Sequence, residues 1–317
     1  MDLLGLHHLT AISADIRGNH RFYTQVLGLR LVKRSVNQDD VTAYHLFYAD
    51  AKGNPGTDIT FFDWPMPRER RGTHSIARTC MRVRGEATLR WWDEWLREHG
   101  VVTSPLDLVD GRALLCFEDP EGQRLALVDD GGRSPDGEVW NRSPVPAEHQ
   151  IRGLGPVTIS VPVITETEQV LTQVMNMRRV REYAHADNAR IKVHVFEMAE
   201  GGAHAEVHVI AQPDLPVARQ GAGGVHHVAF RTPTEDEYHA WTDRLNTVGI
   251  PNSGEIDRYW FRSLYFREPN GVLFEIATDG PGFAVDEDAE TLGEKVVLPP
   301  FLEAHRPQIV AGLKPID

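Results

Sequence analysis

Short apolar runs separated by turn residues recur along most of the chain, and each group of runs includes one segment with helical spacing. The first group begins at Leu6, has its helical segment before Gly28, and continues with apolar runs at 29–32, 43–48 and 57–62. Apolar runs of about four to eight residues predict buried strands, whereas apolar residues three or four positions apart predict one face of a helix. The first group therefore predicts the order strand, helix, strand, strand, strand.

The same order returns three times, beginning near His74, Val157 and His226. In the third and fourth groups, Thr-x-x-Glu capping boxes at 165–168 and 234–237 predict where the helix starts. The later groups place their strands at 74–83, 114–117, 124–128, 157–160, 191–196, 205–210, 226–230, 261–266 and 272–277. The chain therefore reads as four βαβββ modules.

Residues 131–150 interrupt this rhythm with glycine, proline and serine, which are typical of turns and linkers. We therefore place a domain boundary here, with two modules in an N-terminal domain at 1–148 and two in a C-terminal domain at 149–285. The last residues, 286–317, are first acidic and then marked by prolines. We expect them to form a tail that packs on the body.

Composition excludes some classes of partner. The chain has 33 basic and 46 acidic residues, a net charge of −13, which argues against nucleic acid and against anionic membrane surfaces. No apolar run approaches the roughly 20 residues that span a bilayer, and the first residues do not resemble a signal peptide. The two cysteines, Cys80 and Cys116, lie in apolar runs, which favours inert buried thiols and a cytoplasmic location.

Two histidine doublets stand at matching positions, one opening the first module and one the fourth. Side chains alternate along a strand, so one histidine of each doublet faces the same side. Glu275 lies inside an apolar closing strand, where a carboxylate must be paired or bind a metal. This pattern predicts one metal site with His8, His227 and Glu275 as ligands. Two histidines and one carboxylate with other positions open are typical of non-haem Fe(II) enzymes.

The other modules lack such a set. His74 opens the second module without a doublet or a carboxylate in the closing strand, so we interpret it as structural. The third module begins at 155–157 with Gly-Pro-Val and offers no ligand. In the first module, Asp58 is the only acid of the closing strand and stands near its start. We therefore expect one metal cleft rather than two.

The βαβββ order, with Asp-Pro-Glu-Gly and Glu-Pro-Asn-Gly turns before two closing strands, resembles the module of the vicinal oxygen chelate superfamily. Glyoxalase I, bleomycin-resistance proteins and extradiol ring-cleaving dioxygenases belong to that superfamily, and the resemblance covers roughly residues 5–280. It implies an α+β fold in which four βαβββ modules pair into two domains, with open barrel-like mixed sheets around a metal cleft.

Within the superfamily, ligands from the first and last modules resemble the hydroquinone ring-cleaving dioxygenases. Other extradiol enzymes take both histidines from the third and fourth modules. The segments similar to that group's motifs are Leu6–Thr10, Val225–Val228, Ile256–Phe266, Leu273–Asp279 and Leu298–Arg306. The resemblance implies a small aromatic substrate, dioxygen and Fe(II). Mn(II) is a second candidate, and Zn or Ni can fill such a site in purified protein.

The resemblance also implies roles in catalysis for His7, Thr10, His226, Arg258 and Tyr265. Strand alternation places Thr10 on the ligand face but directs His7 and His226 away from it. An arginine near the metal can hold a phenolate or carbonyl oxygen, and a tyrosine can donate to substrate. Whether the two histidines reach the pocket is open at this point.

Two other functions stay open. A glyoxalase-type lyase or isomerase would use a different divalent metal and, by resemblance, a second carboxylate, for which Asp58 is the only candidate. A protein that sequesters small molecules, like the drug-resistance members of the superfamily, would bind without turnover. The number of subunits is also open, with a homodimer as one arrangement.

Overall fold

The computed structural model describes residues 1–186 and 188–316, and the four predicted βαβββ modules are present in it. Two modules build each of two eight-stranded sheets. The first and fourth modules form the first sheet. Their elements are β1 (Leu6–Ser13), α1 (Ile16–Arg21), β2 (Arg30–Asn37), β3 (Asp40–Ala49), β4 (Asp58–Asp63), β13 (Val225–Thr232), α4 (Glu235–Thr247), β14 (Ile256–Asp257), β15 (Arg262–Arg267) and β16 (Leu273–Thr278).

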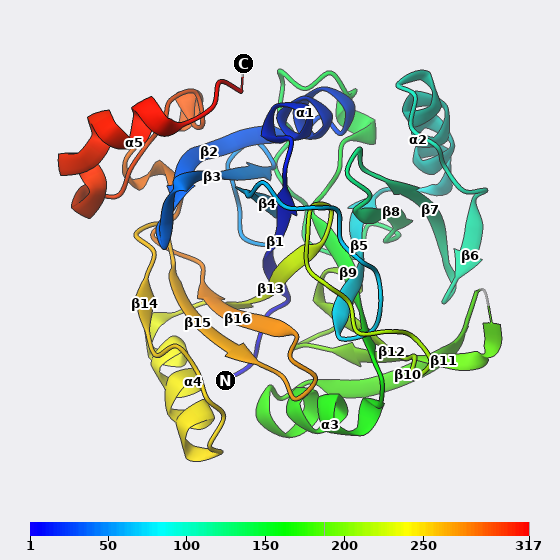
Figure 1. Ribbon diagram of the computed structural model, residues 1–317. Helices are drawn as coiled ribbons and strands as arrows, with labels where there is room; N and C mark the ends of the chain where they lie inside the picture. Colours follow the sequence, from blue (N-terminus) through cyan, green and yellow to red (C-terminus); the bar gives the residue numbers. More distant parts are fainter. Residues whose placement is uncertain (187, 317) are drawn as a thin grey trace.

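β1 and β13 pair antiparallel at the centre of this sheet. Each also pairs in parallel with the closing strand of its own module, β1 with β4 and β13 with β16. The strand order is β14-β15-β16-β13-β1-β4-β3-β2, which is symmetric about the central pair. Figure 1 shows the sheet curled into an open half-barrel. The predicted α+β fold with curled mixed sheets is confirmed.

The second and third modules form the second sheet in the same way, with order β10-β11-β12-β9-β5-β8-β7-β6. Their elements are β5 (Ser75–Val83), α2 (Glu86–Glu98), β6 (Asp107–Val109), β7 (Arg112–Glu118), β8 (Arg124–Asp129), β9 (Leu154–Val161), α3 (Ile164–Gln169), β10 (Arg178–His185), β11 (Asn188–Glu197) and β12 (Glu206–Ala211).

The two sheets combine the modules in one way, and the contacts between helical regions combine them in another. Each sheet combines one module from 1–148 with one from 149–285, so it is assembled across the predicted boundary. Helical regions of the same half contact each other instead: the Trp95 indole of α2 donates to the carbonyl of Val26, which follows α1, at 2.8 Å. The boundary therefore stays a prediction about the division of the chain and not about the sheets.

The two capping boxes have different outcomes. Thr234 is the N-cap of α4, and its hydroxyl accepts from the Glu237 amide at 3.2 Å, as predicted. The box predicted at 165–168 is wrong, because α3 begins at Ile164 and has no side-chain cap. Glu168, the carboxylate end of the predicted box, instead pairs with Arg179 of β10 at 3.1 Å. A tertiary ion pair therefore engages the carboxylate that the box would have used.

Helices pack their apolar faces on the outer sides of the sheets. Trp92 of α2 and Trp241 of α4 are fully buried in one core cluster that extends through both sheets. No helix among residues 1–186 and 188–316 is long and apolar enough to cross a membrane.

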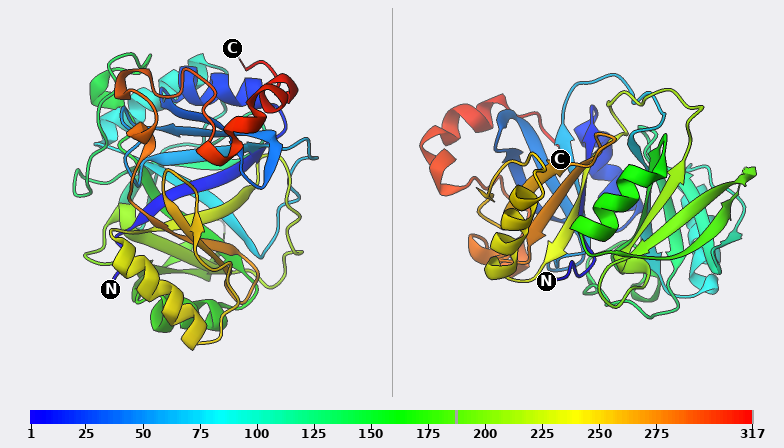
Figure 2. Two further views of the ribbon diagram at one scale, coloured as in Figure 1. Left: turned by 90° about the vertical axis from the view of Figure 1, so that its left-hand side faces the viewer. Right: turned by 90° about the horizontal axis from the view of Figure 1, so that it is seen from below.

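The residues after β16 pack on the first sheet. Helix α5 (Arg306–Gly312) lies beside β2 and β3 in Figures 1 and 2. Leu298 and Ile309 bury their side chains against Val36 of β2. Lys33, also on β2, is fully buried and donates to the carbonyl of Phe283 at 3.0 Å.

The Lys33 ammonium also pairs with two partly buried carboxylates, Asp286 at 2.8 Å and Glu287. We expect Lys33→Ala to lower the free energy of unfolding by about 3–5 kcal/mol, because it leaves both carboxylates without a cation. It should also expose residues 283–292 to limited proteolysis. Lys52→Ala is the control, since Lys52 pairs with Glu138 on the surface, where a pair contributes about 0–1 kcal/mol. Equal thermal midpoints for the two variants would contradict the assignment.

Candidate metal centre

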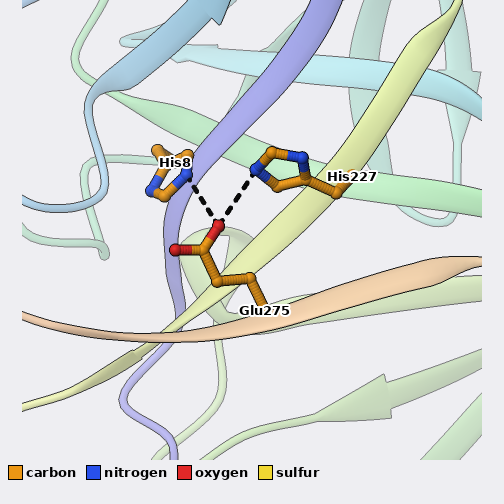
Figure 3. Close-up of side chains that lie close together, drawn as sticks. All are labelled: His8, His227 and Glu275. Atoms are coloured by element: carbon orange, nitrogen blue, oxygen red, sulfur yellow. Dashed lines mark ion pairs between the residues drawn. The ribbon is translucent and has the colours of Figure 1, made fainter. Parts of the chain in front are cut away.

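The three predicted ligands come from three strands and meet at one point. His8 of β1 and His227 of β13 direct Nε2 at the same oxygen, Oε2 of Glu275 on β16, at 3.1 and 3.0 Å (Figure 3). The side chains are 2%, 3% and 0% exposed, so no bulk water solvates them. The arrangement brings two imidazole nitrogens and a carboxylate oxygen within reach of one ion.

Strand register explains this meeting. His8 lies opposite Ala229, and Thr10 lies opposite His227, so the two ligand histidines are related by the local symmetry of the β1–β13 pair. Ala229 in turn lies beside Glu275 on the neighbouring strand β16. Because register partners face the same side of a sheet, all three ligands point to the concave side.

The same symmetry shows what stands opposite the glutamate. Thr10 lies beside Thr60 of β4 in the register that pairs Ala229 with Glu275. Thr60 therefore occupies the place where a second carboxylate would complete a four-ligand site. Asp58, the acid considered for that role, is buried but is not one of the three clustered groups. The donor set is two histidines and one carboxylate.

The triad is not satisfied by hydrogen bonds of its own. His227 Nε2 and Glu275 Oε2 are buried, and neither has a hydrogen bond of acceptable geometry within the described part of the chain. Unpaired buried polar atoms are costly and rare. A divalent ion bound to both imidazoles and the carboxylate would satisfy them, and such N and O donors suit a first-row metal. The residues present therefore fit a resident metal.

Burial and nearby charge together set the protonation states of the ligands. Burial opposes the ionisation of Glu275, but the nearby imidazoles of His8 and His227 outweigh it and hold the pKa of the carboxyl well below its ordinary value. Burial also lowers the pKa of His227 and so favours neutral imidazole. Metal ligands need these two forms, a carboxylate and an unprotonated ring nitrogen.

His7 and His226 lie behind the ligands rather than in the cavity. Their Nδ1 atoms are 2.9 and 2.8 Å from the Nδ1 atoms of His8 and His227. Both positions are β-bulges, since the β1–β13 register passes over them, and a bulge turns a side chain away from strict alternation. This arrangement answers the question left open by the sequence: the two histidines contact the ligands directly.

The contacts of His7 also select the tautomer of His8. His7 Nε2 lies 3.0 Å from the carbonyl of Thr278, so this nitrogen donates and His7 Nδ1 accepts. His8 then donates from Nδ1 and keeps Nε2 unprotonated toward Glu275. Burial lowers the pKa of His7 to about 3, which keeps the ring neutral. Such outer partners orient metal ligands and raise their basicity.

A small cavity adjoins the triad, with about 30 Å³ of space, room for about one or two water molecules. Arg258 and Tyr265, for which the resemblance implied roles in catalysis, line it. Most of the remaining wall is aromatic or polar: Asn37, Gln38, Asp39, His45, Phe47, Phe62, Trp260 and Phe261. Four apolar rings, Phe47, Phe62, Trp260 and Phe261, beside several polar groups suit a flat aromatic molecule that carries hydroxyl groups.

Arg258 holds the two sides of this cavity together. Its guanidinium donates to both carboxylate oxygens of Asp39, at 3.2 and 2.8 Å, and lies 5.4 Å from the centre of the Tyr265 ring. Gln38 donates to the carbonyl of Arg258 at 2.8 Å. These contacts join the β2–β3 turn to the segment after β14. With these contacts in place, the cavity has about 30 Å³, which is too small for an aromatic ring.

Three polar residues of the site were not predicted from the sequence. Ser263 donates to Glu275 Oε1 at 2.5 Å, which fixes the carboxylate. The Thr60 hydroxyl is 2.9 Å from His45 Nε2 and 2.8 Å from the Thr10 hydroxyl. Each is a single polar residue in a strand, without the repeated doublet that marked the ligands. Thr10 takes part in the site through this chain of hydrogen bonds.

The family model described as Glyoxalase/Bleomycin resistance protein/Dioxygenase superfamily matches residues 5–127 and 153–276. The chain belongs to this superfamily. The two matched segments correspond to the first pair and the second pair of modules. The predicted superfamily is therefore confirmed.

Within the superfamily, relatives that match the whole chain are named as ring-cleaving dioxygenases. "Putative ring-cleaving dioxygenase MhqA" of Bacillus subtilis (strain 168) is 46% identical over 100% of both chains. The chlorohydroquinone/hydroquinone 1,2-dioxygenase of Sphingobium indicum is 28% identical over 96% of this chain and 94% of its own. A crystal structure of a "putative dioxygenase" from Bacillus subtilis subsp. subtilis str. 168 superposes with a TM-score of 0.90 and 33% identity, over 99% and 98% of the chains. The chain is thus a member of the ring-cleaving dioxygenase group.

We expect His8→Ala, His227→Ala and Glu275→Ala each to lose the bound metal, because two remaining ligands hold a divalent ion poorly. Glu275→Gln should also bind weakly, since an amide no longer offsets the charge of the cation. The measurement is metal content after dialysis, together with Mn(II) titration of metal-free protein. His239→Ala is the control, because His239 is an exposed histidine on α4 paired with Glu255. Full metal content in any triad alanine variant would remove that residue from the ligand set.

Proposed function

We propose that this chain is a non-haem Fe(II)-dependent dioxygenase that opens hydroquinone-type rings, which are substituted 1,4-dihydroxybenzenes. The observation that carries the proposal is the donor set of His8, His227 and Glu275 with Thr60, rather than a carboxylate, in the fourth place. A two-histidine, one-carboxylate site keeps positions open for substrate and dioxygen. The full-length relative named for hydroquinone and chlorohydroquinone supports this substrate class.

When bound, Fe(II) would supply a Lewis acid for a phenolate oxygen and an electronic path from the ring to dioxygen. The chain's own residues bind and orient the ring. Substrate entry requires Arg258 to exchange its partner, from the carboxylate of Asp39, which is 73% exposed, to an oxygen of the substrate. The exchange keeps the guanidinium paired throughout, so entry needs no unpaired buried charge. Phe47, Phe62 and Phe261 then offer ring faces on which an aromatic substrate can stack.

Two polar groups beside the triad can form hydrogen bonds with the substrate. Burial raises the pKa of Tyr265, so its hydroxyl stays protonated and can donate to a substrate oxygen. Burial lowers the pKa of His45 well below its ordinary value, so its neutral ring is a weak base that can accept a hydrogen bond from a hydroquinone hydroxyl without taking its proton. Cleavage of the carbon–carbon bond beside the hydroxylated carbon, with both atoms of dioxygen retained, gives a ring-opened acid.

The free cysteines support a cytoplasmic location for the proposed enzyme. Cys80 and Cys116 are both free. Burial raises the pKa of the Cys80 thiol to about 12, so it is unreactive. Cys116 is only half-buried, which differs from the expectation of two buried thiols.

We expect oxygen consumption with hydroquinones only from the Fe(II)-loaded protein, or from the Mn(II)-loaded protein. Zinc has no accessible second oxidation state, so zinc-loaded protein should bind substrate without consuming oxygen. The measurement is oxygen uptake by anaerobically prepared, metal-reconstituted protein with hydroquinone and with catechol. Equal turnover of any substrate with zinc would indicate Lewis-acid chemistry and favour a glyoxalase-type reaction. Binding without turnover by every metal form would favour a sequestering protein.

We expect Arg258→Ala and Tyr265→Phe to keep their iron and to lose about 10–100-fold in turnover, because both groups act on substrate and not on the metal. His226→Ala should also keep most of its iron and turn over slowly. Iron content and the initial rate with the best hydroquinone are measured on the same preparations. Arg262→Ala is a matched control, since Arg262 lies on β15 and pairs with Glu235 at the surface. Wild-type rates in both Arg258→Ala and Tyr265→Phe would contradict the assigned roles.

A further inference from the structure

The second sheet encloses a larger cavity that the proposed reaction does not use. Its volume is about 720 Å³, and residues of β5, β7 and β9 to β12 line it. This half-barrel is the counterpart of the one that holds the triad (Figure 1). Small-molecule sites in proteins usually have about 300–1,000 Å³, so the space is sufficient for a ligand.

Strand register relates the positions of the two half-barrels. In the first sheet His8 lies opposite Ala229, which lies beside Glu275. In the second sheet Arg78 lies opposite Thr158, which lies beside His208. Arg78 therefore stands in the place of His8, and His208 in the place of Glu275. A permanent cation has replaced a metal ligand.

The floor of the second half-barrel is a closed polar network. Asp110, Glu206 and His208 are near enough to one another to share a metal ion. However, Arg112 donates to both oxygens of Glu206 at 2.7 Å, and Arg181 donates to Asp110 at 2.6 Å. Two guanidiniums already neutralise the carboxylates, so this group is an ion-pair network and not a second metal site.

Arg78 has no such partner. It is half-buried and lines the cavity, and its Nε is buried without a hydrogen bond. Within the described part of the chain, no carboxylate lies within ion-pair distance of its guanidinium. Arg71 and Arg124, which also line the cavity, are paired with Glu118 at 2.7 Å and Glu69 at 3.7 Å. Arg78 is thus a half-buried cation without an acidic partner, which an anion would stabilise.

Two more guanidiniums, those of Arg71 and Arg124, line the cavity with Arg78. Burial lowers the pKa of Arg124, and the positive charges of Arg71 and Arg78 lower it further, while Glu69 opposes both effects. Arg71 and Arg124 have acidic partners, and Asp107 is a further carboxylate of the cavity lining, so among the described residues Arg78 is the guanidinium there without an ion pair. An anion bound at Arg78 would supply that missing partner.

We propose that this cavity binds a small organic carboxylate. The planar guanidinium of Arg78 can donate two parallel hydrogen bonds to a carboxylate, and the half-buried Thr158 beside it offers a hydroxyl. Leu114, Val193 and Ile210 provide apolar wall for the body of the ligand. The proposal does not depend on the reaction assigned to the first sheet.

The test uses 4-fluorobenzoate as the probe, with binding to the full-length protein followed by ¹⁹F NMR. We expect saturable binding that weakens at least about tenfold in Arg78→Gln, because a charged, bidentate partner is lost. Arg78→Lys keeps the charge without the planar fork and should be intermediate. Arg90→Gln is the control, since Arg90 lies on the exposed face of α2 and pairs with Glu86. His227→Ala, which disables the metal cleft, should bind the probe as wild type does.

Two further ligands test whether a carboxylate is required, and thermal stability tests whether the variants are folded. The neutral analogue 4-fluorobenzamide should bind at least about tenfold more weakly than the acid, and inorganic phosphate should not displace the acid. Arg78→Gln removes an uncompensated charge, so its thermal midpoint should not fall. Undiminished binding in Arg78→Gln, loss of binding in His227→Ala, equal binding of the amide, or displacement by phosphate would each overturn the proposal.

Discussion

The antiparallel pairing of β1 with β13 is the constraint on which the rest of the structure depends. It brings together His8 and His227, which are 227 − 8 = 219 positions apart, because His8 pairs with Ala229 and Thr10 with His227 in the stretch between the two bulges. Both strands lie at the centre of a buried sheet, where a slip of one residue would turn every side chain to the opposite face. The same register therefore fixes the relative positions of the two histidine ligands. Glu275 needs only the parallel pairing of its own module to join the two histidines.

The strands that the sequence pattern identified are those that the fold buries, and the strands that it did not identify lie at sheet edges. The three unpredicted strands are β6, β10 and β14, and each is an edge strand of its sheet. β10 is largely exposed and carries arginine and glutamate, so it has no apolar period to detect. The apolar pattern within each module does not indicate which two modules share a sheet. A metal site shared by the first and fourth modules requires those modules to be neighbours, and the strand order of the first sheet meets this requirement.

In the site, residues in a repeated pattern could be predicted from the sequence, and isolated polar residues could not. The ligand histidines were found because a doublet recurs at matching positions, and Glu275 because a carboxylate inside an apolar strand needs an explanation. His45 and Ser263 gave no such signal, and Asp39 stands in a turn whose partner lies 219 positions away, at Arg258. Strand alternation alone would have directed His7 and His226 away from the ligands. The bulges in β1 and β13 changed the direction of these two side chains. A bulge cannot be predicted here, because the same residue types occur in a regular strand.

The two half-barrels show how one backbone frame supports opposite electrostatics. In each, a central antiparallel pair and a closing strand direct a few side chains to the concave side, and burial makes any unpaired polar atom there costly. In the first, two histidines and a glutamate leave nitrogen and oxygen atoms unpaired, so a cation is needed. In the second, an arginine replaces one histidine and the carboxylates near it are already neutralised, so the unsatisfied charge is positive. The frame therefore decides where a ligand can be held, and the residues at two or three register positions decide its sign.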